Sequence, residues 1–214
     1  MSGGQIDGGD DEKTQVIDGN GEVNTQVVER KEVMSFTSVE EANDYNLLYN
    51  SFPLALPSVL PENAELNRID VDPPGGEFTA HGASVLYNLI VDDEAWNQAD
   101  SPYIAYIMLG QYDYGIPGAG LMEFERAYNS GPWSSEISPG EIYEYETVQI
   151  MLGDTKAVLY SQYMPVLLGQ KEPSDVVGAG IVWYKDGINY FLSVFAPGDM
   201  VDYESLISIA ESVG

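Results

Sequence analysis

The stretch Ile181-Val182-Trp183-Tyr184-Lys185-Asp186-Gly187-Ile188-Asn189-Tyr190-Phe191-Leu192 consists of two apolar runs joined by Asp-Gly. Asp-Gly between alternating apolar runs predicts a β-hairpin, because a two-residue type I′ turn needs positive φ at both central positions. With the turn at Asp186-Gly187, Trp183 lies opposite Tyr190, and the other pairs follow by counting outward. The faces of this hairpin indicate where the core of the domain lies.

The two faces of the predicted hairpin differ, because successive side chains of a strand point to opposite sides. One face is apolar and is predicted to be core; it consists of Ile181, Trp183, Ile188, Tyr190, Leu192 and Val194. The opposite face is mixed, with Asn189 and Ser193 among Val182, Tyr184 and Phe191. We expect that second face to be lightly covered or partly exposed to water. A register slip of one residue would exchange the two faces.

Helices are predicted on either side of the strands. After Pro197-Gly198, Asp199 or Asp202 can cap a closing helix, and its apolar stripe consists of Tyr203, Leu206, Ile207, Ala210 and Val213. Burial of a leucine or isoleucine from such a stripe contributes roughly 1.5–3 kcal/mol. Near the N-terminus, Ser38-Val39-Glu40-Glu41 is a capping-box pattern and predicts a helix that continues to Tyr49.

The remaining segments are mostly β. The Pro-rich segment from Phe52 to Leu66 is predicted to be extended and fastened to the fold, because its prolines exclude an ordinary helix. Apolar runs predict strands at 66–71, 83–91, 102–111, 144–151 and 156–163. We therefore predict an α+β fold: a single, mostly antiparallel β-sheet with the N- and C-terminal helices packed on one face.

Composition divides the chain into a tail and one domain. Residues 1–30 are polar, acidic and glycine-rich, which predicts a disordered tether. Residues 31–214 are predicted to form a single α+β domain. Within it, residues 112–140 contain many glycines and prolines without a clear period and are predicted to be an irregular loop insertion.

The charge of the chain excludes several function classes. There are 8 basic and 35 acidic residues, so the formal net charge is −27, which repels phosphate backbones and anionic lipid headgroups. We therefore expect no nucleic-acid partner and no direct binding to a membrane surface. The chain has no cysteine, so it lacks disulfides and thiolate ligands. We expect a monomer without a metal or cofactor.

The chain contains few residues of the types that commonly carry out catalysis. The chain has one histidine, His81, in a stretch that resembles a surface loop, and Ser84 is near it without a nucleophile-elbow motif. Acidic pairs such as Glu123/Glu125 and Glu144/Glu146 are expected by chance among so many acids, although a hydrolase based on two carboxylates remains an alternative. We expect no enzyme activity.

The candidate site residues are the aromatic side chains of the 112–140 segment: Tyr112, Tyr114, Tyr128 and Trp133. Exposed rings beside Asp113 and Glu123 would suit stacking on a sugar or a peptide. The alternative is that these rings hold an irregular segment against the core, since the segment has few aliphatic residues to do so. We favour this structural interpretation and keep ligand binding as a hypothesis.

Two segments resemble a known family. Phe52-Pro53-Leu54-Ala55-Leu56-Pro57-Ser58-Val59-Leu60-Pro61 is similar to the family's FPxxLPxxLPxG segment, and Ile181-Val182-Trp183, Gly187-Ile188-Asn189-Tyr190 and Leu206 to Ser212 are similar to its closing segment. The segment from Val148 to Leu159 is also similar to a segment of this family. This domain-of-unknown-function family occurs in Gram-positive lipoproteins and in extracytoplasmic halves of membrane proteins, including anti-sigma-factor-like ectodomains. Asn63 stands where the family has glycine, and the family offers no catalytic residues to carry over.

The resemblance implies an extracytoplasmic location, with anchoring to the membrane through a segment outside this sequence. We expect a non-enzymatic sensing or binding domain of a cell-envelope protein, with a protein or glycan partner in the envelope. The first alternative is a carrier or chaperone for a lipid or other apolar ligand held between sheet and helices. The second is the carboxylate-based hydrolase.

Overall fold

The computed structural model describes nine ranges of the chain: residues 13–17, 23–27, 32–74, 80–91, 105–130, 133–138, 141–162, 176–197 and 202–214. In the first two ranges, in 133–138 and in a few strand ends, the description extends to the backbone only. The possible cap Asp199 lies outside the described residues.

The described part contains three helices and eleven strands. The helices are α1 (Val39–Asn50), α2 (Ala119–Asn129) and α3 (Tyr203–Glu211). The strands are β1 (Lys13–Ile17), β2 (Val23–Val27), β3 (Met34–Phe36), β4 (Ala64–Asp72), β5 (His81–Leu89), β6 (Tyr106–Asp113), β7 (Trp133–Ser138), β8 (Glu141–Leu152), β9 (Thr155–Gln162), β10 (Val176–Lys185) and β11 (Ile188–Pro197).

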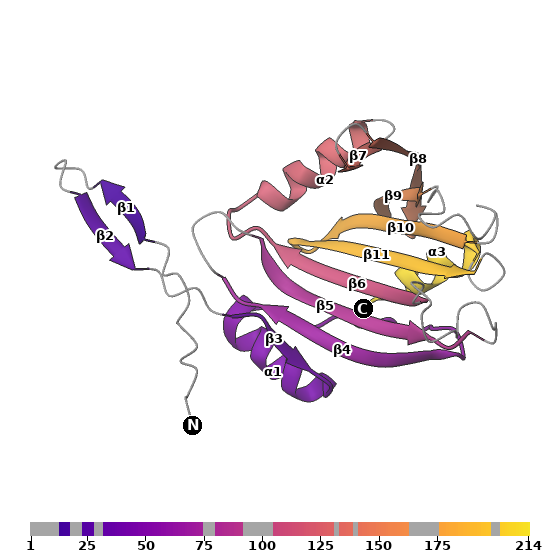
Figure 1. Ribbon diagram of the computed structural model, residues 1–214, viewed down its shortest axis with the longest axis horizontal. Coiled ribbons are helices and arrows are strands. Elements are labelled where there is room, and N and C mark those ends of the chain that lie inside the picture. Colours follow the sequence, from indigo (N-terminus) through magenta and orange to yellow (C-terminus); the bar gives the residue numbers. More distant parts are fainter. Residues whose placement is uncertain are drawn as a thin grey trace, which may run out of the picture.

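Nine of these strands form one sheet in the order β3-β4-β5-β6-β11-β10-β9-β8-β7, and every neighbouring pair is antiparallel (Figure 1). The predicted α+β class with an antiparallel sheet is therefore confirmed. One neighbour relation is not sequential, because β6 pairs with β11 across the middle of the sheet. This pairing places residues of the central segment beside the closing hairpin.

The hairpin of β10 and β11 has the predicted register. Trp183 lies opposite Tyr190, and the rings of these two residues stack with centroids 5.1 Å apart. Asp186 and Gly187 have φ angles of 53° and 93°, as a turn with two positive φ angles requires. On the predicted core face, Ile181 and the other aliphatic residues are buried, whereas the second face is half-buried throughout.

The core lies between the first face of the sheet, α1, α3 and the Pro-rich segment. Ala42 of α1 and Leu206 of α3 belong to the same buried cluster as Ile181 and Leu192. Both helices start at the expected caps: the Glu41 N–H donates to Ser38 Oγ at 3.4 Å, and the Ser205 N–H donates to Asp202 Oδ1 at 2.7 Å.

The predicted stripe of α3 needs one correction. Ile209 is buried in the core, whereas Tyr203 is 49% exposed. Residues 206, 209, 210 and 213 form the buried stripe, which is rotated from the predicted one toward Ile209.

The Pro-rich segment is extended and attached to the fold, as predicted, and two of its attachments link it to the closing helix and to the sheet. Pro57 forms a bridge with Val213 beside the closing helix. At the other place, the side chain of Gln111 in β6 donates from Nε2 to the Ala55 carbonyl at 2.8 Å and accepts from the Ala55 N–H at 2.7 Å. Gln111 is fully buried, so this amide joins the segment to the centre of the sheet.

Two predicted irregular regions contain regular structure. Residues 112–140, predicted to be an irregular loop insertion, include the end of β6, all of α2 and strand β7. The segment predicted to be a disordered tether includes β1 and β2, which pair with each other in a separate two-stranded sheet. Helix α2 is amphipathic and buries Phe124, so the glycines and prolines of residues 112–140 interrupt regular elements instead of excluding them.

Helix α2 lies on the second face of the sheet. Its buried residue Phe124 lines a cleft together with Val182 and Phe191, and these two residues point away from the core face. Helices α1 and α3 thus contribute buried residues to the core cluster, whereas α2 contributes Phe124 to the cleft on the second face. Of the helices in the described ranges, none has the length and apolar character needed to cross a bilayer.

Candidate functional site

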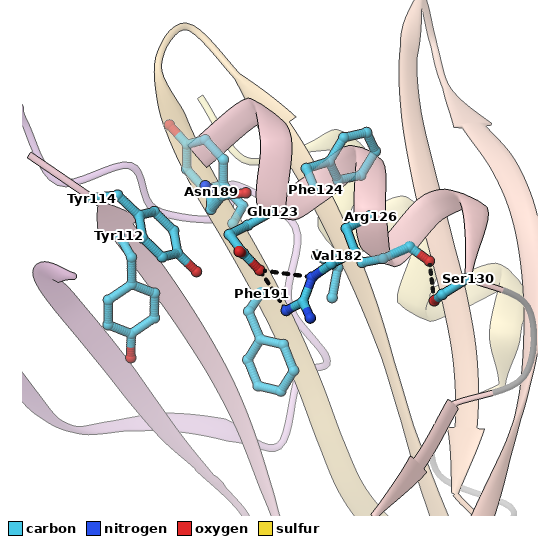
Figure 2. A pocket seen from close by; sticks show the side chains of 11 residues that line it. Tyr112, Tyr114, Glu123, Phe124, Arg126, Ser130, Val182, Asn189 and Phe191 are labelled. Atoms are coloured by element: carbon cyan, nitrogen blue, oxygen red, sulfur yellow. Dashed lines mark hydrogen bonds and ion pairs between the residues drawn. The ribbon is translucent and has the colours of Figure 1, made fainter. Parts of the chain in front are cut away.

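An open cleft of about 650 Å³ lies between α2 and the second face of the sheet (Figure 2). A volume of this size is typical of sites for small molecules. It is lined by Tyr112, Tyr114, Glu123, Phe124, Arg126, Ala127, Ser130, Val182, Asn189, Tyr190 and Phe191. The lining residues come from β6, α2, β10 and β11, which are far apart in the sequence but adjacent in the fold.

The floor of the cleft is apolar and held in place by the sheet. Val182 and Phe191 lie directly opposite each other in β10 and β11. On the same face of the sheet, the ring of Tyr160 stacks on that of Phe191, with centroids 6.0 Å apart and planes 17° apart. Gly180 makes room for that ring, because a Cβ there would collide with the Tyr160 hydroxyl and with backbone. Phe191 is therefore a fixed aromatic surface, half-buried and open to the cleft.

Tyr112 and Tyr114 form the wall on the β6 side (Figure 2). The ring of Tyr112 lies over Gly110, where a Cβ would come within 2.6 Å of the ring. The Tyr112 and Ser84 hydroxyl groups are hydrogen-bonded at 2.7 Å, which fixes the ring orientation. This wall depends on glycine in β6 in the same way that the floor depends on glycine in β10.

Helix α2 forms the opposite wall and supplies the charged groups. Its sequence between Ala119 and Asn129 is rich in good helix formers, and Arg126 binds Glu123 three residues earlier. The guanidinium donates to Glu123 Oε2 from Nη2 at 2.6 Å and from Nε at 3.2 Å. Arg126 is largely exposed and Glu123 is 44% exposed, so the ion pair is accessible from the open side of the cleft.

The hydroxyl of Tyr114 lies in the field of that ion pair. Burial raises the pKa of Tyr114, the Glu123 carboxylate raises it further, and the Arg126 guanidinium partly lowers it. Tyr114 is therefore a neutral phenol at physiological pH, able to donate and to accept a hydrogen bond. In Figure 2 its hydroxyl points toward the space between the strands and the helix.

Two amides near the beginning of α2 contain a buried atom without a described hydrogen-bond partner. Asn189 Nδ2 lies under Gly120, where a Cβ would approach it to 2.5 Å, and this nitrogen has no hydrogen-bond partner in the described part of the chain. A second cleft of about 490 Å³ adjoins this end of the helix and is lined by Asn50, Asp113 and Asp186 among others. Asn50 Oδ1 is buried there and likewise has no described partner.

The four aromatic residues predicted from the sequence do not form one group. Tyr112 and Tyr114 line the same cleft. Tyr128 instead fastens the end of α2: its ring lies 5.7 Å from that of Phe124, and Lys156 Nζ of β9 lies 5.4 Å from its centroid. The backbone of Trp133 pairs with Tyr145 in β7 and β8, and its side chain lies outside the described residues.

The other residues considered for catalysis do not come together in the structure. His81 is buried in β5 and not in a surface loop as predicted, and its Nε2 lies 3.9 Å from Asp113 Oδ2. Ser84 is three residues along the same strand, so it points to the other face and bonds Tyr112. Glu123 lines the cleft, while Glu125 is exposed, because residues two apart on a helix do not share a face.

Sequence reasoning named Glu123 beside the candidate rings but missed Val182, Phe191, Phe124 and Arg126 as cleft residues. A signal existed for the first two, since the second face of the hairpin was expected to be partly exposed and nevertheless carries apolar side chains. The spacing of Glu123 and Arg126 is also a helical ion-pair signal. What the sequence lacked was the pairing of β6 with β11, which brings Tyr112 beside Asn189.

No protein-family model matches the chain, and a comparison with curated proteins gives no match either. The resemblance to the envelope-protein family therefore stays a prediction.

Proposed function

We propose that this chain is a non-enzymatic, extracytoplasmic sensing or binding domain of a cell-envelope protein, and that it binds a protein or glycan partner in the cleft under α2. The observation that carries the proposal is the cleft itself: fixed aromatic and aliphatic side chains on three sides, with an exposed ion pair at the opening. An apolar pocket with a few convergent polar groups is the usual form of a ligand site.

The extracytoplasmic location rests on the family resemblance and on the acidic composition. A net charge of −27 keeps a domain soluble in a crowded or salty setting and repels anionic surfaces. The binding role is favoured over hydrolysis because Glu123 is the one carboxylate that lines the cleft among the described residues, and it is paired with Arg126. A carboxylate mechanism needs two acids on either side of the substrate.

A carrier of a lipid or other apolar ligand is the second candidate, favoured by the apolar floor at Val182 and Phe191. The cleft under α2 would be its site, since the opposite face of the sheet is filled by the core cluster. The charged pair at the opening and the shallow, open form favour a ligand with polar groups instead.

A tryptophan that fills the cleft should abolish binding. Ala127 lines the cleft from α2, so Ala127→Trp places an indole where the ligand would lie. We expect wild-type protein to retain at least one probe from a panel of solubilised peptidoglycan fragments, neutral wall polysaccharides and secreted proteins, and the variant to retain none. The measurement is biolayer interferometry on immobilised protein.

Met122→Trp is the matched control. Met122 is on the outer side of the same helix and is 71% exposed, so an indole there leaves the cleft open. This control should bind like wild type, and both variants should show the wild-type thermal unfolding midpoint within a few degrees. Equal binding by wild type and Ala127→Trp, or turnover of a probe without stable binding, would contradict the proposal.

A further inference from the structure

The cleft under α2 has the composition of a carbohydrate site. A pyranose ring has two flat faces, one of which presents C–H groups, and a rim of hydroxyl groups that both donate and accept hydrogen bonds. An aromatic side chain suits the flat face, while paired charged or amide groups suit the rim. The cleft contains both kinds of surface within a single opening, in Phe191 below and Glu123 with Arg126 above.

The aromatic surfaces are rigid before any ligand binds. The ring of Phe191 stacks with that of Tyr160. The ring of Tyr112 lies over Gly110 and is held there by the hydrogen bond between the Tyr112 and Ser84 hydroxyl groups. Rigid rings lose little side-chain entropy on binding, which is where stacking sites gain affinity. Both rings are therefore held in place by neighbouring side chains before a ligand binds.

The polar groups of the cleft suit hydrogen bonds to adjacent hydroxyl groups of a sugar. Glu123 offers an acceptor oxygen, Arg126 offers donors beyond the two that it gives to Glu123, and the Tyr114 phenol can do either. A carboxylate and a guanidinium held side by side can thus bind two neighbouring hydroxyls at once. Hydrogen bonds to charged groups are the stronger class, and both partners here stay accessible to a ligand.

An extended peptide fits the cleft less well. Peptides commonly bind a sheet by adding a strand to a free edge. The floor of this cleft is made by β10 and β11, whose backbones are hydrogen-bonded on both sides, to β9 and to β6 respectively. A peptide there would find side chains but no free backbone groups. Saccharides need only side chains.

The charge of the domain selects among saccharides. With 35 acidic against 8 basic residues, the chain repels phosphate-bearing and uronic-acid polymers at the ionic strength of dilute media. A neutral sugar is not affected, and the single guanidinium in the cleft is already paired with Glu123. We propose, resting on the binding role proposed above, that the cleft binds a neutral oligosaccharide, stacked on Phe191 and hydrogen-bonded to Glu123, Arg126 and Tyr114.

Isothermal titration calorimetry of the full chain with cello-, malto- and chito-oligosaccharides tests this assignment. We expect measurable binding of at least one of these neutral series and affinity about tenfold to a hundredfold lower for Glu123→Gln, which keeps the shape but removes the charge. Glu125→Gln, on another face of α2, is the matched control and should bind like wild type. Phe191→Leu should also lose binding while the thermal unfolding midpoint reports that the variant is folded.

The outcomes of these binding experiments distinguish failure of the carbohydrate assignment from failure of the binding role on which it rests. If a secreted protein or peptide binds in a manner sensitive to Ala127→Trp while no oligosaccharide does, the carbohydrate assignment fails and the binding role stands. If neither kind of probe binds, both fail. If an oligosaccharide binds with equal affinity to wild type, Glu123→Gln and Phe191→Leu, the sugar lies elsewhere and the assignment to this cleft is overturned.

Discussion

Gln111→Met should lower the free energy of unfolding by about 3–5 kcal/mol. The substitution leaves two buried backbone groups without hydrogen-bond partners, at roughly 1–3 kcal/mol each, and the new side chain packs less well than glutamine does. The two groups are the N–H and the carbonyl of Ala55, which Gln111 binds at 2.7 and 2.8 Å. Methionine has a similar size and flexibility, so the loss reports the hydrogen bonds more than the volume. Urea unfolding followed by tryptophan fluorescence measures it, since Trp183 is buried.

Gln149→Met is the control for this change. Gln149 is also a strand glutamine whose Nε2 donates to a backbone carbonyl, that of Tyr128, at 2.8 Å, but it is exposed. Water replaces such a bond, so the expected loss is below about 1 kcal/mol. Similar losses for the two variants would mean that the Pro-rich segment is not held to the sheet through Gln111.

Gly82→Ala should destabilise the domain by about 3 kcal/mol or more, at the upper end of what overpacking costs. A Cβ on Gly82 would point directly at the backbone carbonyl of Gln111 in the neighbouring strand, and backbone in the middle of a sheet cannot move aside. The ladder between β5 and β6 would have to open, which would also disturb the Asn50 amide that donates to the Gly82 carbonyl at 3.1 Å. Differential scanning calorimetry measures the fall in melting temperature.

The comparison for that variant is Gly153→Ala. Gly153 has a φ of 55°, and a methyl group added there would meet no atom within 4 Å, so the substitution costs only the backbone strain of an αL residue, about 1–2 kcal/mol. We expect the Gly82 variant to melt well below the Gly153 variant. The reverse order would show that β5 and β6 are not packed as closely as the structure has them.

Local sequence signals specified the parts of the fold that depend on short-range chemistry. Asp186-Gly187 needs positive φ angles, so its turn fixed the register of ten residue pairs between β10 and β11. Ser38 and Asp202 likewise mark helix starts, because their side chains accept the first free N–H groups. In each case the residues that decide the structure are within a few positions of one another.

Long-range relations were not predictable in the same way. The N-cap of helix α2 is Gly118, which has a positive φ and offers no capping side chain, so the sequence carries no start signal for this helix. The buried pairing of Gln111 with Ala55 joins positions 56 apart, and a glutamine alone does not announce it. The cleft depends on β6 lying beside β11, so only two of its rings, Tyr112 and Tyr114, were named in advance.

The most direct test of the central claim, that this domain binds its partner in the cleft under α2, is an amide chemical-shift map. The assigned ¹⁵N-labelled chain is titrated with the probe that binds most tightly among the oligosaccharides, wall fragments and secreted proteins. We predict that the largest shift changes fall at the cleft-lining residues, which are Glu123, Phe124, Arg126 and Ala127 of α2 and Asn189, Tyr190 and Phe191 of β11. Changes concentrated in α1 or along β3 and β4 would contradict the account.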